Sequence, residues 1–453
     1  MEDVALLLSS SEGQSSVVEI RPGTQISCFK NNTTVPNGTC TVKCRASFGG
    51  CGGGGEFAVS TQAKGLSLHV YRWGQPQPLY RCHTPEKITC LAASPDGMYL
   101  VGGAQSGQLC VWSLGTGMLV LSVEAHYRST SAISFVEDVG VDVLVTGGED
   151  ALVHGWSLGQ LLQRQHAMSY DRGATGGKLW TGADHSLAVG ALCPLPGQGR
   201  VASASLDCTG KIWDAWSGCL LYSVTCPSGL RSVAADPNGS FVFFGSVRGP
   251  VYRVELEACA MSATAASAQA AGRSTLEGKS EKGGAEPRAL VGHEAAVTSL
   301  AYSQSTNLLL SCSEDGTMRS WHVLTGQCLK TVRPQKEGGG GASGPLAQVL
   351  VVPRPYALSS HTSRTNEGVS TGMGARKGGR GKSGPAVAAT PLQPLKKHRQ
   401  ESTGKSGEAS CGDLSEFLDT GPVWVGQSSM VQQGLRTPCS CHFSSSAFLH
   451  WKR

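Results

Sequence analysis

Short apolar runs alternate with polar turns along the chain, and one unit of this pattern recurs from residue 12 to residue 321. In each copy a turn residue, usually followed by glycine, precedes a large apolar residue by six positions. Such a turn favours a tight hairpin, and the residues after it alternate faces along an extended strand. The unit therefore predicts a hairpin with a buried apolar anchor. The pairs are Glu12…Val18, Lys64…Val70, Ser106…Trp112, Asp150…Trp156, Asp207…Trp213, Arg248…Val254 and Asp315…Trp321.

Two further apolar segments precede most hairpins, for example 89–92 and 98–101. The turn sequence Ser94-Pro-Asp-Gly97 separates these two segments, and Asp236-Pro-Asn-Gly239 separates the equivalent pair in a later copy. Each copy is thus predicted to be a four-stranded antiparallel meander. The anchors lie 41 to 67 residues apart, and a blade of a β-propeller takes roughly 40–45 residues. Where the spacing between consecutive anchors exceeds the length of one blade, the additional residues predict flexible inserts, at about 32–55, 159–183 and 258–288.

The two ends of the repeat region complement each other. The first copy has only two strands, Val4–Leu8 and Ser16–Ile20, and two more are expected at Ala347–Val352 and Tyr356–Ser359. Together they complete one blade, which closes the ring and removes its free edges. We therefore predict an all-β, seven-bladed propeller over residues 1–360, closed by N- and C-terminal strands.

Three copies also carry a histidine, a hydroxyl residue and an aspartate at matching positions. These tetrads are His126, Thr146, Asp150, Trp156; His185, Ser203, Asp207, Trp213; and His293, Ser311, Asp315, Trp321. The unit resembles the WD repeat, and that resemblance implies a buried hydrogen-bond network in each tetrad. Buried polar groups must be paired, so the residue types fit this interpretation. Ser-His-Asp catalysis is the alternative, and recurrence in three copies argues against it.

The order and the defects of the repeats resemble one branch of the WD-repeat family more closely. The segments are 87–103, 143–158, 201–224, 243–256 and 290–332, with Val254 replacing tryptophan in the sixth copy. They are similar to the WD-repeat subunits of Rix/PELP-type complexes. This resemblance implies a non-catalytic nuclear scaffold, in the nucleolus and nucleoplasm, for pre-60S ribosome assembly and removal of the second internal transcribed spacer. It implies a Rix-type scaffold subunit, an AAA-type remodelling ATPase and the pre-60S particle as partners, and a link to DNA replication licensing.

Composition and charge limit the cellular compartment and the classes of partner that the protein can have. The net charge is +5 and the pI about 8.4, too mildly basic to predict nucleic-acid binding, so RNA contact is expected to be indirect. The acidic start Met1-Glu2-Asp3 does not fit a signal peptide, and no run reaches the length of a membrane span. The 17 scattered cysteines do not fit a secreted disulfide scaffold. We expect an intracellular, soluble protein with reduced thiols and no membrane partner.

Residues 361–453 form a separate low-complexity, basic tail, for which we expect disorder. Two basic clusters in it are candidate nuclear-targeting signals, with a solvated linker as the alternative. Their residues are Arg376, Lys377, Arg380, Lys382, Lys396, Lys397 and Arg399. The related subunits end in a heptad-bearing helix, and residues 411–453 show no such pattern.

Cofactor and metal signatures are weak. Cys40, Cys44 and Cys51 lack a fourth ligand for zinc, and Cys439, Cys441 and His442 are too closely spaced. The glycine-rich run 52–55 lacks the Gly-Lys-Ser/Thr of a phosphate-binding loop. We therefore expect no metal, no cofactor and no enzymatic activity.

Two other functions remain open at this level. One is a WD-repeat adaptor such as a ubiquitin-ligase substrate receptor, although Trp213-Asp214 lacks the Trp-Asp-x-Arg continuation that such receptors often carry. The other is a propeller enzyme, which would need a convergent acid, base or metal set in the central channel.

Overall fold

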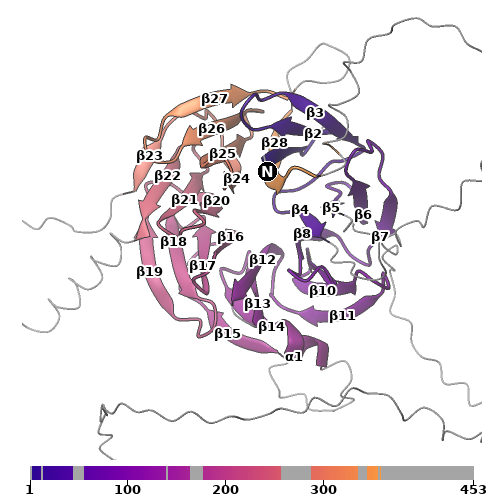
Figure 1. The fold of residues 1–453 in the computed structure, drawn as a ribbon. Helices are drawn as coiled ribbons and strands as arrows, with labels where there is room; N and C mark the ends of the chain where they lie inside the picture. The colour runs from indigo at the N-terminus through magenta and orange to yellow at the C-terminus, as the bar shows by residue number, and fades with distance from the viewer. Residues whose placement is uncertain are drawn as a thin grey trace, which may run out of the picture. The chain divides into compact units, whose positions relative to one another are not determined.

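The computed structural model describes residues 3–11, 14–43, 56–138, 141–163, 177–256, 287–334, 344–355 and 358. Within these residues, 28 strands form seven four-stranded antiparallel sheets, which surround a common centre as blades (Figure 1). The prediction of an all-β, seven-bladed propeller is confirmed.

We number the blades in chain order and give their strands from the innermost to the outermost. Blade 1 consists of β28 (Leu346–Pro353), β1 (Asp3–Ser9), β2 (Gln14–Glu19) and β3 (Gln25–Lys30). Blade 2 consists of β4 (Thr39–Lys43), β5 (Glu56–Thr61), β6 (Ser67–Arg72) and β7 (Tyr80–His83). Blade 3 consists of β8 (Ile88–Ala93), β9 (Tyr99–Ala104), β10 (Gln108–Ser113) and β11 (Leu119–Glu124).

Blade 4 consists of β12 (Thr130–Asp138), β13 (Val141–Gly148), β14 (Val153–Ser157) and β15 (Lys178–Gly182), with the short helix α1 (Leu158–Gln163) after β14. Blade 5 consists of β16 (Val189–Leu195), β17 (Arg200–Ser205), β18 (Thr209–Asp214) and β19 (Leu220–Thr225). Blade 6 consists of β20 (Leu230–Ala235), β21 (Phe241–Ser246), β22 (Val251–Glu255) and β23 (Arg288–Leu290). Blade 7 consists of β24 (Val297–Ser303), β25 (Leu308–Ser313), β26 (Met318–His322) and β27 (Cys328–Val332).

The innermost strands of neighbouring blades contact one another around the whole ring. Because successive strands of a meander run in opposite directions, their connections alternate between the two faces of the ring. Connections from the second to the third strand share a face with those that lead from an outermost strand to the next blade. We call this side the tetrad face, because the histidine and aspartate of each predicted tetrad lie in its connections.

The closing blade differs from the expected division of its strands. The N-terminal part supplies three strands and β28 alone comes from the C-terminal part, so the expected division into two and two is wrong. The last of these three N-terminal strands is β3, the outermost strand of blade 1. It was missed because Gln25–Lys30 mixes polar and apolar residues and follows a proline-glycine turn. Of the segment 356–359, only Leu358 is described, and it is buried against the core of blades 1 and 2.

Two predicted inserts contain structural strands, so their bounds are corrected. Strand β4 lies inside the expected insert 32–55 and forms the innermost strand of blade 2, and β15 lies inside 159–183 as the outer strand of blade 4. Both strands are only five residues long and border glycine-rich sequence, which hides their alternation. Residues 44–55, 164–176 and 257–286 lie outside the described residues, as does the tail 361–453.

The predicted anchors all lie in the third strand of a blade, and each of them is buried. They pack into clusters that join one blade to the next; Trp112, for example, packs with Val42 and Val59 of blade 2. Burying one large apolar side chain is worth roughly 1.5–3 kcal/mol. The hydrophobic core is thus a ring of contacts between blades, and each blade depends on its neighbours.

Two hairpin turns of the tetrad face place non-glycine residues in the left-handed region. Ala151 has φ 66° and Cys208 has φ 67°, at positions where Gly107, Gly249 and Gly316 stand in other blades. A side chain there costs roughly 1–2 kcal/mol, which glycine avoids. We expect Ala151→Gly to raise the free energy of unfolding by about 1 kcal/mol, measured by urea denaturation. The control Ala204→Gly, in strand β17, should lower it; a loss at both positions would contradict the strain argument.

Candidate functional site

The tetrad of blade 5 forms one continuous chain of hydrogen bonds. Trp213 Nε1 donates to Ser203 Oγ at 2.8 Å, and Ser203 Oγ lies 2.8 Å from His185 Nε2. His185 Nδ1 then donates to Asp207 Oδ2 at 2.9 Å. The chain joins the third strand, the second strand and two connections of the tetrad face.

The tetrads of blades 4 and 7 repeat this geometry. In blade 7, His293 bonds Asp315 at 2.8 Å and Ser311 at 2.7 Å, and Trp321 donates to Ser311 at 2.8 Å. In blade 4 the three corresponding distances, in which Thr146 supplies the hydroxyl, are all 3.0 Å. The structure therefore brings together all twelve residues that the sequence singled out.

The environment of the serine and threonine hydroxyls does not fit nucleophilic catalysis. Ser203, Thr146 and Ser311 are all 0% exposed. Each hydroxyl also lies between an indole N–H and an imidazole. A nucleophile must be reached by its substrate. The arrangement instead fixes two connections of the tetrad face to the blade core.

Acid should weaken these networks. Burial raises the pKa of Asp207, but hydrogen bonds from Thr209, Ser186 and His185 outweigh that effect and lower the pKa to about 2. Burial also lowers the pKa of His185 and of His293 below their ordinary value, against the raising effect of the neighbouring aspartates. At acidic pH the unfolded chain therefore binds more protons than the folded protein does. The free energy of unfolding consequently falls as the pH falls.

We expect the thermal midpoint to drop as the pH falls through about 6.5, where unfolded histidines titrate, and again between about 4 and 2, where unfolded aspartates do. Differential scanning calorimetry from pH 8 to pH 2 measures both steps. The His185→Gln, His293→Gln double variant should lose part of the first step. A midpoint that rises toward pH 5 would contradict the assignment.

Blade 6, which lacks the tetrad, carries a replacement that the sequence reading missed. Ser228 Oγ lies 3.1 Å from the hydroxyl of Tyr252 and also bonds the hydroxyl of Ser246, and all three side chains are buried. They join one connection of the tetrad face to the second and third strands of the blade. The signal in the sequence is a tyrosine two residues before the Val254 anchor.

A second missed feature links neighbouring inner strands. Thr89, Ser131 and Thr298 each lie at a β-bulge near the start of an inner strand. Each hydroxyl donates to a carbonyl of the next inner strand, as from Thr298 to Leu346 O at 2.8 Å. A bulge re-aims one side chain out of the ladder, and here it joins one blade to the next.

The connection between β3 and β4 reaches across the ring. Asn37 Nδ2 donates to Ser131 O at 3.2 Å and to Gly190 O at 3.0 Å, while Leu91 N donates to Asn37 O at 3.0 Å. This connection therefore contacts the inner strands of blades 3, 4 and 5. The protein's own chain therefore occupies this part of the tetrad face.

A pocket of about 170 Å³ lies beside the closing blade, among residues that the structure describes. Its acidic groups are already paired: Asp3 accepts from Ser303 at 2.7 Å, and Glu19 lies 3.2 Å from Arg354. The pocket contains no pairing of a nucleophile with a base among its lining residues. It offers no support for a propeller enzyme.

The tetrad face also carries large apolar side chains in contact with solvent. Leu206 and Val247 lie in the turns of blades 5 and 6, and backbone hydrogen bonds tie these turns to the neighbouring connections at Ala188 and Gly229. Tyr127 is 91% exposed. Exposed apolar side chains can serve in protein interaction sites, and six other large exposed apolar side chains among the described residues lie outside this face. The set on the tetrad face is Leu66, Tyr127, Leu187, Leu206, Val247 and Val291.

The remaining predicted residues give no site in the structure. Cys40 is buried in β4, where burial raises the pKa of its thiol to about 12, and Cys44, Cys51, Cys439, Cys441 and His442 lie outside the described residues. The nuclear-targeting candidates between Arg376 and Arg399 also lie outside them. Among the described residues, no helix is long and apolar enough to span a membrane.

Comparison with known proteins gives consistent matches. Three segments match the family described as WD domain, G-beta repeat: residues 74–113, 176–214 and 284–322. The chain is 31% identical over 333 residues to pre-rRNA-processing protein IPI3 of Yarrowia lipolytica, covering 72% of each protein. It is 31% identical over 339 residues to WD repeat-containing protein 18 of Danio rerio, covering 71% of each. Protein ROOT INITIATION DEFECTIVE 3 of Arabidopsis thaliana is 28% identical, with 80% of this chain and 76% of that protein covered.

Proposed function

Because the chain belongs to the family of WD repeat-containing protein 18 and pre-rRNA-processing protein IPI3, we propose that it is a non-catalytic scaffold in pre-rRNA processing and ribosome biogenesis. The similarity to IPI3, at 31% identity over 72% of both chains, is the observation that carries this proposal. It extends over 333 residues rather than over a single motif.

The surface of the propeller supports a scaffold. A closed ring holds its connections in fixed positions, and the tetrads attach several of these connections to the blade cores. The exposed apolar residues of the tetrad face then form a preorganised surface, which lowers the entropy that binding costs. A large partner assembly fits such a surface better than a small substrate does.

The finer proposal follows the family resemblance of the sequence. The protein would act in the nucleus, in a complex with a Rix-type subunit, and would present an AAA-type ATPase to the pre-60S particle during removal of the second internal transcribed spacer. The basic clusters between Arg376 and Arg399 would direct nuclear import. A contribution to DNA replication licensing is a further part of this proposal.

Charge on the tetrad face should disrupt assembly without disrupting the fold. We expect the Leu206→Asp, Val247→Asp variant to lose at least tenfold in recovery with large-subunit precursors, because buried unpaired carboxylates are costly at an interface. The measurement is affinity capture from nuclear extract, followed by sedimentation and mass spectrometry. The control Met98→Asp, Leu324→Asp places the same charges in exposed positions on the opposite face.

The outcomes separate the proposals. Wild-type protein that recovers no ribosomal precursor would contradict the scaffold role itself. Equal recovery by both double variants would reject only the tetrad face as the interface. Recovery of ubiquitin-ligase subunits without ribosomal material would favour the substrate-receptor alternative.

A further inference from the structure

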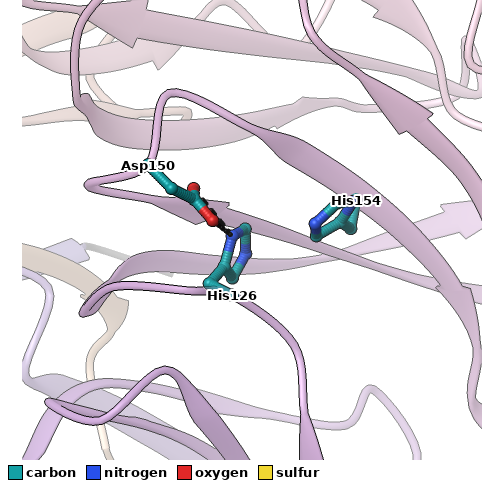
Figure 2. A group of neighbouring side chains, drawn as sticks. All are labelled: His126, Asp150 and His154. Carbon is teal, nitrogen blue, oxygen red and sulfur yellow. Dashed lines mark hydrogen bonds and ion pairs between the residues drawn. The ribbon is translucent and has the colours of Figure 1, made fainter.

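Blade 4 differs from the other two tetrad-bearing blades at one buried position. His154 lies two residues before the anchor Trp156, where blade 5 has Lys211 and blade 7 has Arg319. Its side chain is only 2% exposed, and its ring centroid lies 4.7 Å from that of His126. Figure 2 shows the His154 ring beside the His126–Asp150 pair, with a ring nitrogen on the side toward that pair.

The three side chains place ligand atoms close together. One atom each from His126, Asp150 and His154 lie within 4.8 Å of one another, and His126 Nδ1 lies 3.0 Å from Asp150 Oδ1. Ligand distances of about 2.0–2.2 Å around a tetrahedral zinc ion imply ligand atoms roughly 3.3–3.5 Å apart. An inward movement of His154 by up to about 1.5 Å, with a slight separation of His126 from Asp150, meets this requirement.

The surrounding hydrogen bonds orient these ligands. His154 Nδ1 lies 3.0 Å from Thr181 Oγ1, so a proton on Nδ1 leaves the lone pair of Nε2 available. His126 Nε2 lies 3.0 Å from Thr146 Oγ1, and Asp150 accepts backbone N–H groups from Tyr127 and Leu152 at 3.1 Å. Partners of this kind are typical around metal-bound histidines and carboxylates.

We propose that blade 4 binds one divalent transition-metal ion of the zinc class through His126, Asp150 and His154, with a water molecule in the fourth position. The ion takes the place of the proton on His126 Nδ1, and that proton moves to Nε2, which then donates to Thr146 Oγ1, so that the imidazole stays neutral and no net proton is released. Two neutral nitrogen ligands and one carboxylate suit zinc or cobalt rather than calcium or magnesium. In this role the ion joins two connections and the third strand, adding stability to the tetrad face.

Blades 5 and 7 lack the third ligand of this site. Lys211 and Arg319 stand at the position of His154, and a protonated lysine or arginine has no lone pair to offer an ion. The substitution His154→Lys therefore copies blade 5 into blade 4 and supplies a matched variant.

The experiment uses the full chain, stripped with a chelator, kept under a phosphine reductant and titrated with Co²⁺ and then Zn²⁺. We expect one ion bound with a visible d–d spectrum of nitrogen and oxygen ligation and a rise in thermal midpoint with Zn²⁺. The His154→Lys and His154→Phe variants should bind one equivalent less. The control His69→Phe, at a buried histidine of blade 2 that bonds Asn31 O, should retain it.

The 17 cysteines of the chain provide the main competing ligands. Cobalt bound by thiolates gives an intense near-ultraviolet charge-transfer band that nitrogen and oxygen ligands do not give. Equal metal stoichiometry in wild type and in both His154 variants, or a thiolate spectrum alone, would overturn the proposal. Two His154 variants of different character keep the test valid if one of them folds poorly.

Discussion

A chain that ends at residue 343 is expected not to form the closed ring. It lacks β28, which pairs with β1 along its whole length, from Asp3↔Pro353 to Ser9↔Leu346. The loss also removes five buried apolar side chains, namely Leu346, Ala347, Val349, Val352 and Leu358. At roughly 1.5–3 kcal/mol for each large side chain, this is about 6–12 kcal/mol. That range is comparable with the whole stability of a typical domain, about 5–15 kcal/mol.

A buried polar contact adds to the loss. Gln348 forms two hydrogen bonds of 3.0 Å with the backbone of Thr39, one from its amide nitrogen and one to its amide oxygen. They join the inner strands of blades 1 and 2 at the point where the ring closes. Without β28, both the Thr39 backbone and the edge of the apolar strand β1 are exposed, and an exposed apolar edge favours aggregation.

The matched control is a chain that ends at residue 360, which keeps β28 and Leu358 but lacks the tail. We expect it to unfold cooperatively with a near-wild-type midpoint, while the chain ending at residue 343 is aggregated or lacks a cooperative transition. Circular dichroism and size-exclusion chromatography distinguish the two. Cooperative unfolding of both chains would show that closure by β28 is dispensable.

The sequence allowed prediction of the features that repeat. The hairpin, its anchor and the tetrads recur at fixed spacing, so that one clear copy such as Ser313–Gly326 identifies the degenerate ones. The replacement of Trp by Val254 did not obscure blade 6, because the turn and the alternation of the strand remained. Local chemistry was sufficient for these elements.

What could not be predicted depends on contacts between distant segments. Strand β4 is short and half polar, and its place inside the ring depends on Gln348, 309 residues away. The hydrogen bonds from Asn37 to blades 4 and 5 likewise correspond to no repeated pattern in the sequence. The role of His154 is also invisible locally, because it requires the fold to bring a histidine from the preceding connection beside it.

Replacing Trp213 by alanine should cost about 3–5 kcal/mol in the free energy of unfolding, the largest effect expected of any single substitution proposed for the tetrads. Trp213 is 0% exposed and packs with Trp180 at a ring-centroid distance of 6.2 Å. Its loss leaves a cavity between blades 4 and 5, and it removes the indole donor of Ser203. Chemical denaturation of the chain ending at residue 360 gives the value directly.

The pattern of smaller substitutions tests whether the tetrad acts as one structural unit. Ser203→Ala leaves both the Trp213 indole and His185 Nε2 without their shared partner, so we expect a loss of about 1–3 kcal/mol. If the network is a unit, the double variant Ser203→Ala, Asp207→Ala loses less than the sum of its single variants, because the first change already breaks the chain of bonds. Strict additivity would mean that the four side chains act independently. Unchanged stability in both single variants would show that the tetrad is not what fixes the connections carrying Leu187 and Leu206, and the rigid surface proposed for partner binding would then need another source.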